Sequence, residues 1–428
     1  MFMRSVSLFR LFARRTVLSC HQCVQTATVI ASGEPRIATS VKNSQRQSIF
    51  PVPEPILTQI RCDILLKDAY SGRVVDKVTT NEELWKGKRN IPDLCASSAK
   101  QQLEVLSQQE LVDFIQELAN AALSRELLCT DMNVLHILEK EFCSRAKSLD
   151  GASLLLVADA FFVMRHRCSR YFSAMFREFE HRWTSLVIQK EDVVQLAMCI
   201  ITSRKFPLLL VGNIEKFLNA NVDKFSAGEL SMICFAFFIT NTSFGNVDVM
   251  EKLANAVLDG LPSGTLKPYQ LSNVLKALRH AQFSKLSFYD SLGNALSQST
   301  AFHRESSLTD LCNVAFTYAS LRISSAALFA GISSNAVRLI RDRTQMRLKD
   351  VGRLVWSFAL LQEPLDEAVQ KQLVFMLRRD AQLMQQFSEA FTEALSGLAM
   401  KEIYLVTLLQ RLLSTKFPKH GVVFCPSR

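Results

Sequence analysis

Residues 308–319 read LTDLCNVAFTYA, and residues 348–359 read LKDVGRLVWSFA. In the first stretch, apolar side chains follow the anchor Leu311 at the third, fourth and seventh positions, and Val351 begins the same pattern in the second stretch. Positions with this spacing form one stripe along an α-helix. The two anchors are 40 residues apart, so the stretches predict equivalent helices of a repeat of that length.

The same apolar pattern recurs along most of the chain from about residue 100 onward. Successive anchors are 37 to 43 residues apart, and a second apolar pattern begins 17 residues or so after each of them. Acidic or polar residues precede most anchors, as expected in the first turn of a helix. Ser107 with Glu110, and Ser226 with Glu229, have the spacing of a capping box. The anchors are Leu111, Leu154, Val193, Leu230, Leu271, Leu311, Val351 and Phe391.

These observations predict an all-α protein, a solenoid of about eight helix-turn-helix repeats of roughly 40 residues. One helix pair cannot bury its own apolar face, whereas a stack of pairs can. The solenoid should occupy residues 101–415, after an irregular linker at 36–100 and before a tail at 416–428. We expect its core to contain Leu275, Leu278, Val314, Leu354 and Phe358.

The first residues of the chain have the composition of a targeting segment. Residues 1–26 contain no acid, and on a helix Arg4, Arg10, Arg14 and Arg15 fall in one arc opposite several apolar residues. A basic, amphipathic, acid-free leader is typical of a mitochondrial transit peptide. We predict such a peptide at residues 1–35 and a mature protein in the mitochondrial matrix. The alternative is a disordered basic arm.

Charge and hydropathy limit the function classes. The net charge is +10, but residues 1–50 hold seven basic side chains and one acid, so the rest of the chain carries only +4. A basic chain favours a nucleic-acid partner, and this distribution weakens that argument. The apolar runs are shorter than the ~18 residues of a membrane span, so none is expected.

The helical motif resembles the first helix of octotricopeptide and heptatricopeptide repeats, including those of FAST-kinase-like proteins. The resemblance rests on residues 308–319 and 348–359 and on QLSNVLKAL at 270–278, and it covers roughly residues 105–415. It implies a helical-repeat protein that binds organellar RNA and acts in its stability, processing or translation, or in ribosome assembly. Many such proteins end in a small α/β RAP domain, for which residues 416–428 are too short.

Catalytic and metal-binding motifs are missing from the sequence. There is no phosphate-binding glycine loop, no H-E-x-x-H and no nucleophile elbow. The cysteines are scattered, which predicts reduced structural thiols. His166 lies near Cys168, but no partner pair has ligand spacing. We therefore expect no enzyme, no catalytic residues, no metal site and no cofactor.

Two sets of residues are candidates for RNA contact. The densest basic run of the mature chain can hold phosphates. The second position after the anchor carries amide and guanidinium groups, which can read or stack on bases. The alternatives are a surface loop for the run and a solvated helix face for the other set. The run comprises Arg338, Arg341, Arg343, Arg347, Lys349 and Arg353; the second set comprises Gln195, Asn273, Asn313 and Arg353.

The favoured partner is mitochondrial RNA, either mRNA or rRNA, with mitoribosomal or RNA-processing proteins as further partners. The competing hypothesis is a protein-only scaffold or subunit of the mitoribosome or another mitochondrial assembly. A third interpretation joins the two, as a ribosome-associated solenoid that touches rRNA. An RNA-binding groove needs basic and stackable groups at a repeated position, whereas a scaffold groove would be mixed or apolar.

Overall fold

The computed structural model describes residues 96–410, except 124–131, 165, 167, 263, 343–345 and 385–386. The predicted transit peptide (1–35), nearly all of the predicted linker (36–100) and the tail (416–428) lie outside the described residues. Within these ranges every regular element is helical, which confirms the all-α prediction. The first described helix, α4, begins at Ala96, inside the segment assigned to the linker.

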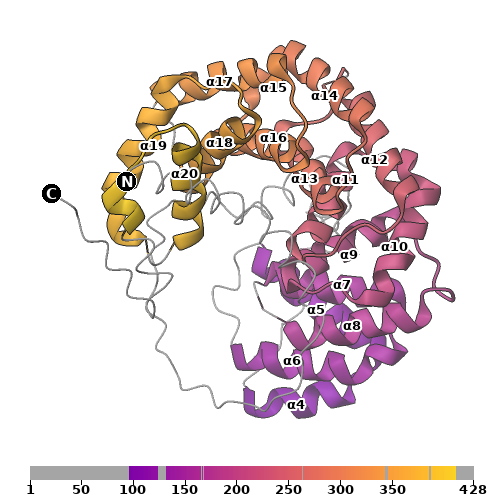
Figure 1. Ribbon diagram of the computed structural model, residues 1–428. Helices are drawn as coiled ribbons and strands as arrows, with labels where there is room; N and C mark the ends of the chain where they lie inside the picture. The colour runs from indigo at the N-terminus through magenta and orange to yellow at the C-terminus, as the bar shows by residue number, and fades with distance from the viewer. Residues whose placement is uncertain are drawn as a thin grey trace, which may run out of the picture.

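The helices form two layers that curve together into an open arc (Figure 1). Each helix of the inner layer contacts the next inner helix along the chain. The inner helices are α5 (Gln108–Leu123), α7 (Gly151–Val163), α9 (Lys190–Ser203), α11 (Ala227–Ile239), α13 (Pro268–His280), α16 (Leu308–Leu321), α18 (Leu348–Leu361) and α20 (Ser388–Met400).

The outer layer is stacked in the same way on the convex side. Its members are α4 (Ala96–Val105), α6 (Met132–Arg145), α8 (Ser169–Arg182), α10 (Leu208–Asn221), α12 (Val247–Gly260), α14 (Leu286–Gln298), α17 (Ala326–Arg341) and α19 (Glu367–Arg379). Short elements join some of them: η2 (Ala146–Ser148), η3 (Val222–Lys224), α15 (Thr300–Glu305) and η4 (Ala381–Leu383). The sequence pattern did not predict α15.

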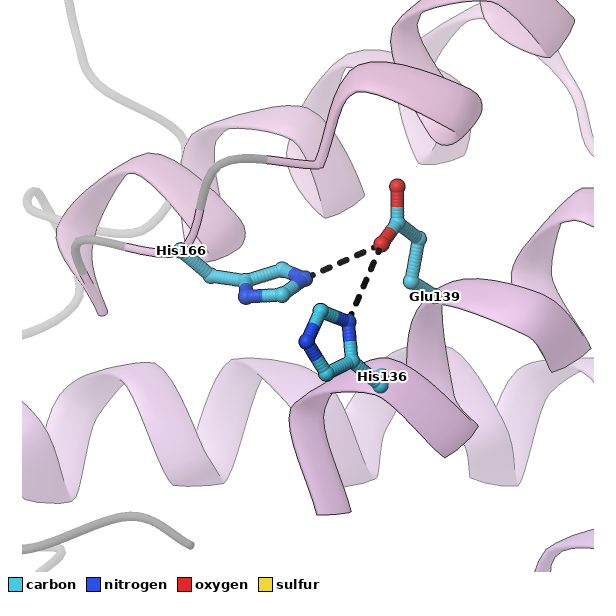
Figure 2. Close-up of side chains that lie close together, drawn as sticks. All are labelled: His136, Glu139 and His166. Carbon is cyan, nitrogen blue, oxygen red and sulfur yellow. Dashed lines mark hydrogen bonds and ion pairs between the residues drawn. The ribbon is translucent and has the colours of Figure 1, made fainter. Parts of the chain in front are cut away.

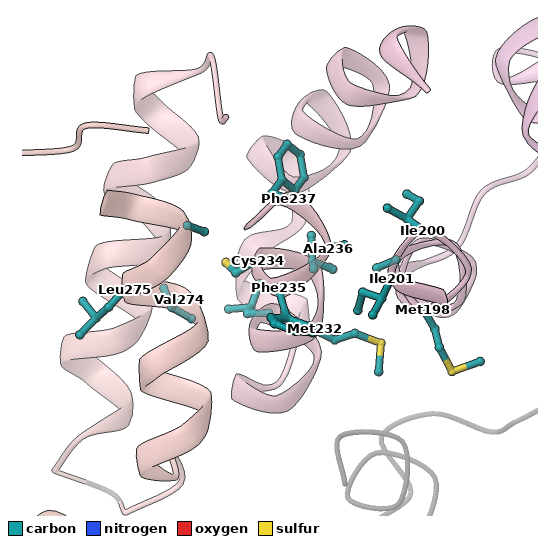
Figure 3. Packing of buried hydrophobic residues seen from close by; sticks show 14 of the residues in the cluster. Met198, Ile200, Ile201, Met232, Cys234, Phe235, Ala236, Phe237, Val274 and Leu275 are labelled. Atoms are coloured by element: carbon teal, nitrogen blue, oxygen red, sulfur yellow. The ribbon is translucent and has the colours of Figure 1, made fainter. Parts of the chain in front are cut away.

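All the anchors are buried, each in a helix of the inner layer. The seventh position after the anchor packs against the outer layer: the Tyr318 hydroxyl donates to the carbonyl of Tyr289, and the rings of Phe358 and Phe329 lie 4.8 Å apart. The residues expected in the core are also buried. Figure 3 shows this core where α9, α11 and α13 meet, with Phe235, Val274 and Leu275 among the packed side chains.

The helix caps predicted from the sequence are present, and a glycine permits one close approach between helices. Both predicted capping boxes form: Ser226 with Glu229, and Ser107 with Glu110, whose carboxylate accepts from the Ser107 amide at 2.8 Å. Helices α18 and α20 approach closely because Gly397 faces the backbone of Trp356, where a Cβ would come within 2.8 Å. Among the described helices, none combines the length and apolarity needed to cross a lipid bilayer.

Candidate nucleic-acid interface

The three amide side chains expected to contact RNA are all buried in the structure. The Gln195 amide donates to the Leu155 carbonyl at 2.6 Å, and the Asn273 amide donates to the Ser231 hydroxyl at 3.2 Å. Asn313 is 8% exposed. These groups lie where consecutive inner helices pack together, so they neither form a solvated face nor reach a base. This burial contradicts both the predicted base contacts of Gln195, Asn273 and Asn313 and their alternative as a solvated helix face.

The basic run does not form one continuous patch. Arg338 and Arg341 end the outer helix α17, whereas Arg347 and Lys349 flank the start of the inner helix α18. Arg347 forms a bidentate pair with Asp350, at 2.8 and 3.0 Å, and Arg338 donates to the His303 carbonyl at 3.1 Å. Arg341 and Lys349 are exposed, and Arg343 lies outside the described residues.

Arg353, which belongs to both sets, is half-buried on the inner layer. Its guanidinium is bidentate to the Glu393 carboxylate, at 2.8 and 3.0 Å, and its carbon lies 4.7 Å from the ring centroid of Phe316. Burial alone would lower the pKa of Arg353, but the hydrogen bond to Glu393 raises it above its usual value. Arg353 is therefore a permanent cation that is already partnered.

Arg353 belongs to a series of cations and aromatic rings that runs across four inner helices. The Nζ atom of Lys276 on α13 lies 5.9 Å from the ring centroid of Phe235 and 5.8 Å from that of Phe238, both on α11. Arg279, also on α13, lies 4.6 Å from the ring centroid of Phe316 on α16. Each of these distances is within the range of a cation–π interaction.

The rings of Phe316 and Trp356 continue the series from α16 to α18, with centroids 5.4 Å apart. We call the whole set the cation–aromatic row: Phe235, Phe238, Lys276, Arg279, Phe316, Arg353 and Trp356.

Helix geometry places this row on the concave side. Phe235, Lys276, Phe316 and Trp356 all occupy the fifth position after their anchors. At about 100° per residue, that position lies on the side of the helix away from the stripe that packs on the outer layer. The four helices α11, α13, α16 and α18 line the inner side of the arc (Figure 1). The fifth position is therefore a sequence signal for this surface, and of the second-position set only Arg353 belongs to the row.

The row is positively charged and only partly neutralised. Burial lowers the pKa of Lys276 to about 8, against the opposing effect of Asp310. Burial, together with the neighbouring Arg353, lowers the pKa of Arg279 to about 10, so Arg279 stays charged at neutral pH. The Nη1 group of Arg279 is buried and has no hydrogen-bond partner among the described residues. A buried cationic donor of this kind is stabilised by an anionic acceptor.

The fold also gives His166 neighbours that the sequence did not reveal. His166 lies in the turn between α7 and α8, and it meets His136 and Glu139 of α6 (Figure 2). His136 and Glu139 are three residues apart, but His166 is 27 residues from Glu139, so spacing along the chain did not connect it with them. The described cysteines, Cys143, Cys168, Cys199, Cys234 and Cys312, are thiols that are not joined in disulfides.

Comparison with known proteins gives a distant relationship. No family model matches the chain. It is 24% identical over 331 residues to the FAST kinase domain-containing protein 5, mitochondrial, of Mus musculus, an alignment that covers 76% of this chain and 41% of the mouse protein. The protein of the same name from Pongo abelii is 24% identical over 291 residues, which are 67% of this chain and 36% of that protein. The chain thus spans less than half the length of these curated relatives. The resemblance inferred from the helix motif is confirmed: the chain is a distant homologue of FAST kinase domain-containing protein 5.

Proposed function

We propose that this chain is a mitochondrial RNA-binding protein that acts in organellar RNA metabolism through a solenoid of eight helix pairs. The observation that carries the proposal is the cation–aromatic row, and within it the half-buried side chain of Arg279, whose guanidinium lies against the ring of Phe316. Single-stranded RNA presents phosphates to cationic donors and base faces to aromatic rings or guanidinium planes.

The row suits a single strand better than a duplex. Phe235 and Lys276 are buried, but each of the four successive inner helices carries a half-buried member of the row: Phe238, Arg279, Phe316 and Trp356. A backbone can therefore follow the row with a contact at each helix. Proteins that bind single strands combine a basic groove with rings on which bases stack. Phe316 and Trp356 are half-buried, so both residues are partly open to solvent on the concave side.

A mitochondrial location is supported by two independent features. The first is the acid-free amphipathic leader of residues 1–26. The second is the distant homology to proteins whose names state a mitochondrial location. The leader further favours the matrix, where the organelle's RNA is found.

A scaffold is the second candidate function, and one observation favours it. Three consecutive outer helices begin with an exposed aliphatic residue: Leu208 on α10, Val247 on α12 and Leu286 on α14. Their exposed fractions are 85%, 58% and 58%. Exposed apolar residues at equivalent positions of neighbouring helices are typical of protein contact surfaces.

One experiment separates the two functions. The tagged full-length protein is crosslinked in intact mitochondria, and its RNA and its co-purifying proteins are both identified from the same sample. RNA binding predicts crosslinked peptides from α11, α13, α16 or α18 on the concave side. Proteins crosslinked to the starts of α10, α12 and α14, with no enrichment of RNA, would instead favour the scaffold.

A further inference from the structure

Three side chains that commonly bind metals converge beside the turn between α7 and α8. His136 and Glu139 lie three residues apart on α6 and so project from one face of that helix. His166 comes from the turn, and its imidazole points at the Glu139 carboxylate (Figure 2). We call His136, Glu139 and His166 the His–Glu–His cluster.

The distances within the cluster suit a shared cation. Nε2 of His166 lies 3.1 Å from Oε2 of Glu139, and Nδ1 of His136 lies 3.8 Å from the same oxygen. The three ligand atoms all lie within 4.8 Å of one another. Two ligands of a tetrahedral zinc ion, each about 2.0–2.1 Å from the metal, are separated by about 3.3 Å. Small side-chain movements would therefore bring all three atoms into coordination.

The carboxylate is held in position by the next helix. Oε1 of Glu139 accepts hydrogen bonds from the backbone amides of Arg170 and Tyr171, at 3.0 and 3.3 Å, in the first turn of α8. This leaves Oε2 directed at the two imidazoles. Second-shell hydrogen bonds of this type orient the ligands of metal sites.

Hydrogen bonding within the cluster does not satisfy its polar atoms. The contact between His136 and Glu139, at 3.8 Å, is too long for a hydrogen bond. Nδ1 of His166 is buried with no hydrogen-bond partner in the described part of the chain, so Nε2, which faces Glu139, is the imidazole nitrogen available to an ion. Glu139 and His166 are both buried, where incompletely bonded polar groups are destabilising.

We propose that the His–Glu–His cluster binds a divalent transition-metal ion of the zinc class. Two imidazoles and one carboxylate are the ligands that zinc accepts, whereas calcium and magnesium prefer oxygen ligands only. The His136 side chain is 63% exposed, so the ion is reached from solvent and retains a solvent position. By binding residues from both segments, the ion crosslinks α6 to the turn between α7 and α8. This site is separate from the cation–aromatic row and independent of RNA binding.

The test measures metal binding by the full-length protein after treatment with a chelator. Zinc is titrated in competition with a chromophoric chelator, and cobalt(II) serves as the spectroscopic probe. Three variants are compared: His136→Ala, which changes an exposed residue; Glu139→Gln, which keeps an acceptor for the α8 amides; and His181→Ala, the control, which removes an exposed histidine of α8.

The wild type and H181A are expected to bind one zinc equivalent that H136A and E139Q lose. Loss of an outer-shell partner weakens metal binding by about 10–100-fold, so loss of a ligand should weaken it by at least about tenfold. The cobalt spectrum should show d–d bands without a thiolate charge-transfer band. Zinc should raise the thermal midpoint of the wild type and H181A, and leave those of H136A and E139Q unchanged.

Three results would overturn the proposal. The first is a wild-type protein that binds no zinc above the level of E139Q. The second is equal zinc affinity in H136A and H181A. The third is a cobalt spectrum dominated by thiolate charge transfer, which would place the ion on cysteines. Circular dichroism of H136A and E139Q shows whether both variants keep the helical fold, so the first two results stay interpretable.

Discussion

The guanidinium carbon of Arg279 on α13 lies 4.6 Å from the ring centroid of Phe316 on α16, and its Nη1 group has no hydrogen-bond acceptor in the described structure. The two residues come from consecutive inner helices. The pair therefore places a charged guanidinium against an aromatic ring on the concave side of the arc.

Replacing Arg279 by Met should separate binding from stability. The substitution keeps an unbranched side chain against Phe316 but removes the charge, so affinity for single-stranded RNA should fall. The slope of log affinity against log salt should become shallower by about 0.7 for the one lost phosphate contact. The thermal midpoint should stay constant or rise, because an unpaired buried charge is removed. Binding is measured by fluorescence anisotropy over a salt series.

The matched control for that experiment is Arg304→Ala. Arg304 lies on α15, is 80% exposed and contacts Glu305. It carries the same charge but lies outside the cation–aromatic row, so the salt slope should equal that of the wild type. Equal slopes for R279M and the wild type would remove Arg279 from the interface.

Lys276 should make stability depend on alkaline pH. Burial lowers its pKa from 10.5 to about 8. Between these values the unfolded chain holds more protons than the folded protein, so stability rises with pH through this window. The destabilisation caused by burying the charge is complete below about pH 8 and is relieved towards pH 10.5.

The Lys276→Met variant lacks this titration. At pH 7.5 the free energy of unfolding of Lys276→Met should therefore exceed that of the wild type. This difference should decrease by up to about 3 kcal/mol between about pH 7.5 and 10.5. Lys276→Arg stays charged throughout and should follow the pH dependence of Lys276→Met. Urea unfolding at several pH values measures the difference. Parallel curves for the wild type and K276M would contradict the buried cation.

Phe358→Ala should create a cavity between the layers. Phe358 is fully buried, with its ring 4.8 Å from that of Phe329. The free energy of unfolding should fall by about 3–5 kcal/mol from lost burial and the residual cavity. Hydrogen exchange should rise first in α16, α18 and α20, because each unit of a stacked array is stabilised by its neighbours. Phe375→Ala, at a ring that is 58% exposed, should change stability by less than about 0.5 kcal/mol.

Two glycine substitutions should have opposite signs. A Cβ at Gly397 would lie 2.8 Å from the Trp356 backbone, so Gly397→Ala should force α18 and α20 apart and destabilise the fold by about 1–3 kcal/mol. A Cβ at Gly212 on α10 meets nothing within 4 Å. Gly212→Ala should stabilise by about 0.5–1 kcal/mol through a less flexible unfolded chain. Thermal unfolding of both variants checks the signs, and a stabilising G397A would contradict the close packing.

The leader should direct import and be removed. The mature protein isolated from mitochondria should lack roughly the first 30 residues, as is usual for an amphipathic transit peptide. N-terminal sequencing of that protein reads the result directly. An organellar form that still begins at Met1, or a tagged full-length chain in the cytosol, would refute the prediction.

The sequence by itself determined the helices and their buried stripes. The anchor pattern repeats with the period of a helix, so the positions that pack, such as Val314 and Phe358, could be predicted without knowing the neighbours. Capping residues are local as well, because Ser226 and Glu229 contact each other within one turn. Residues before Ala96 lie outside the described structure, and the leader among them is predicted from its composition and amphipathic pattern.

The tertiary structure decided which polar residues remain accessible and which distant side chains meet. Periodicity predicts the direction in which a side chain leaves its own helix. Whether that side chain is buried depends on how closely the next helix packs against it. For that reason Gln195 and Asn273 are buried, although they lie on the face the sequence selected. The contact between Arg279 and Phe316, and the approach of His166 to Glu139, join separate units of the stack. Such contacts are fixed only when those units pack, because no spacing along the chain encodes the geometry between them.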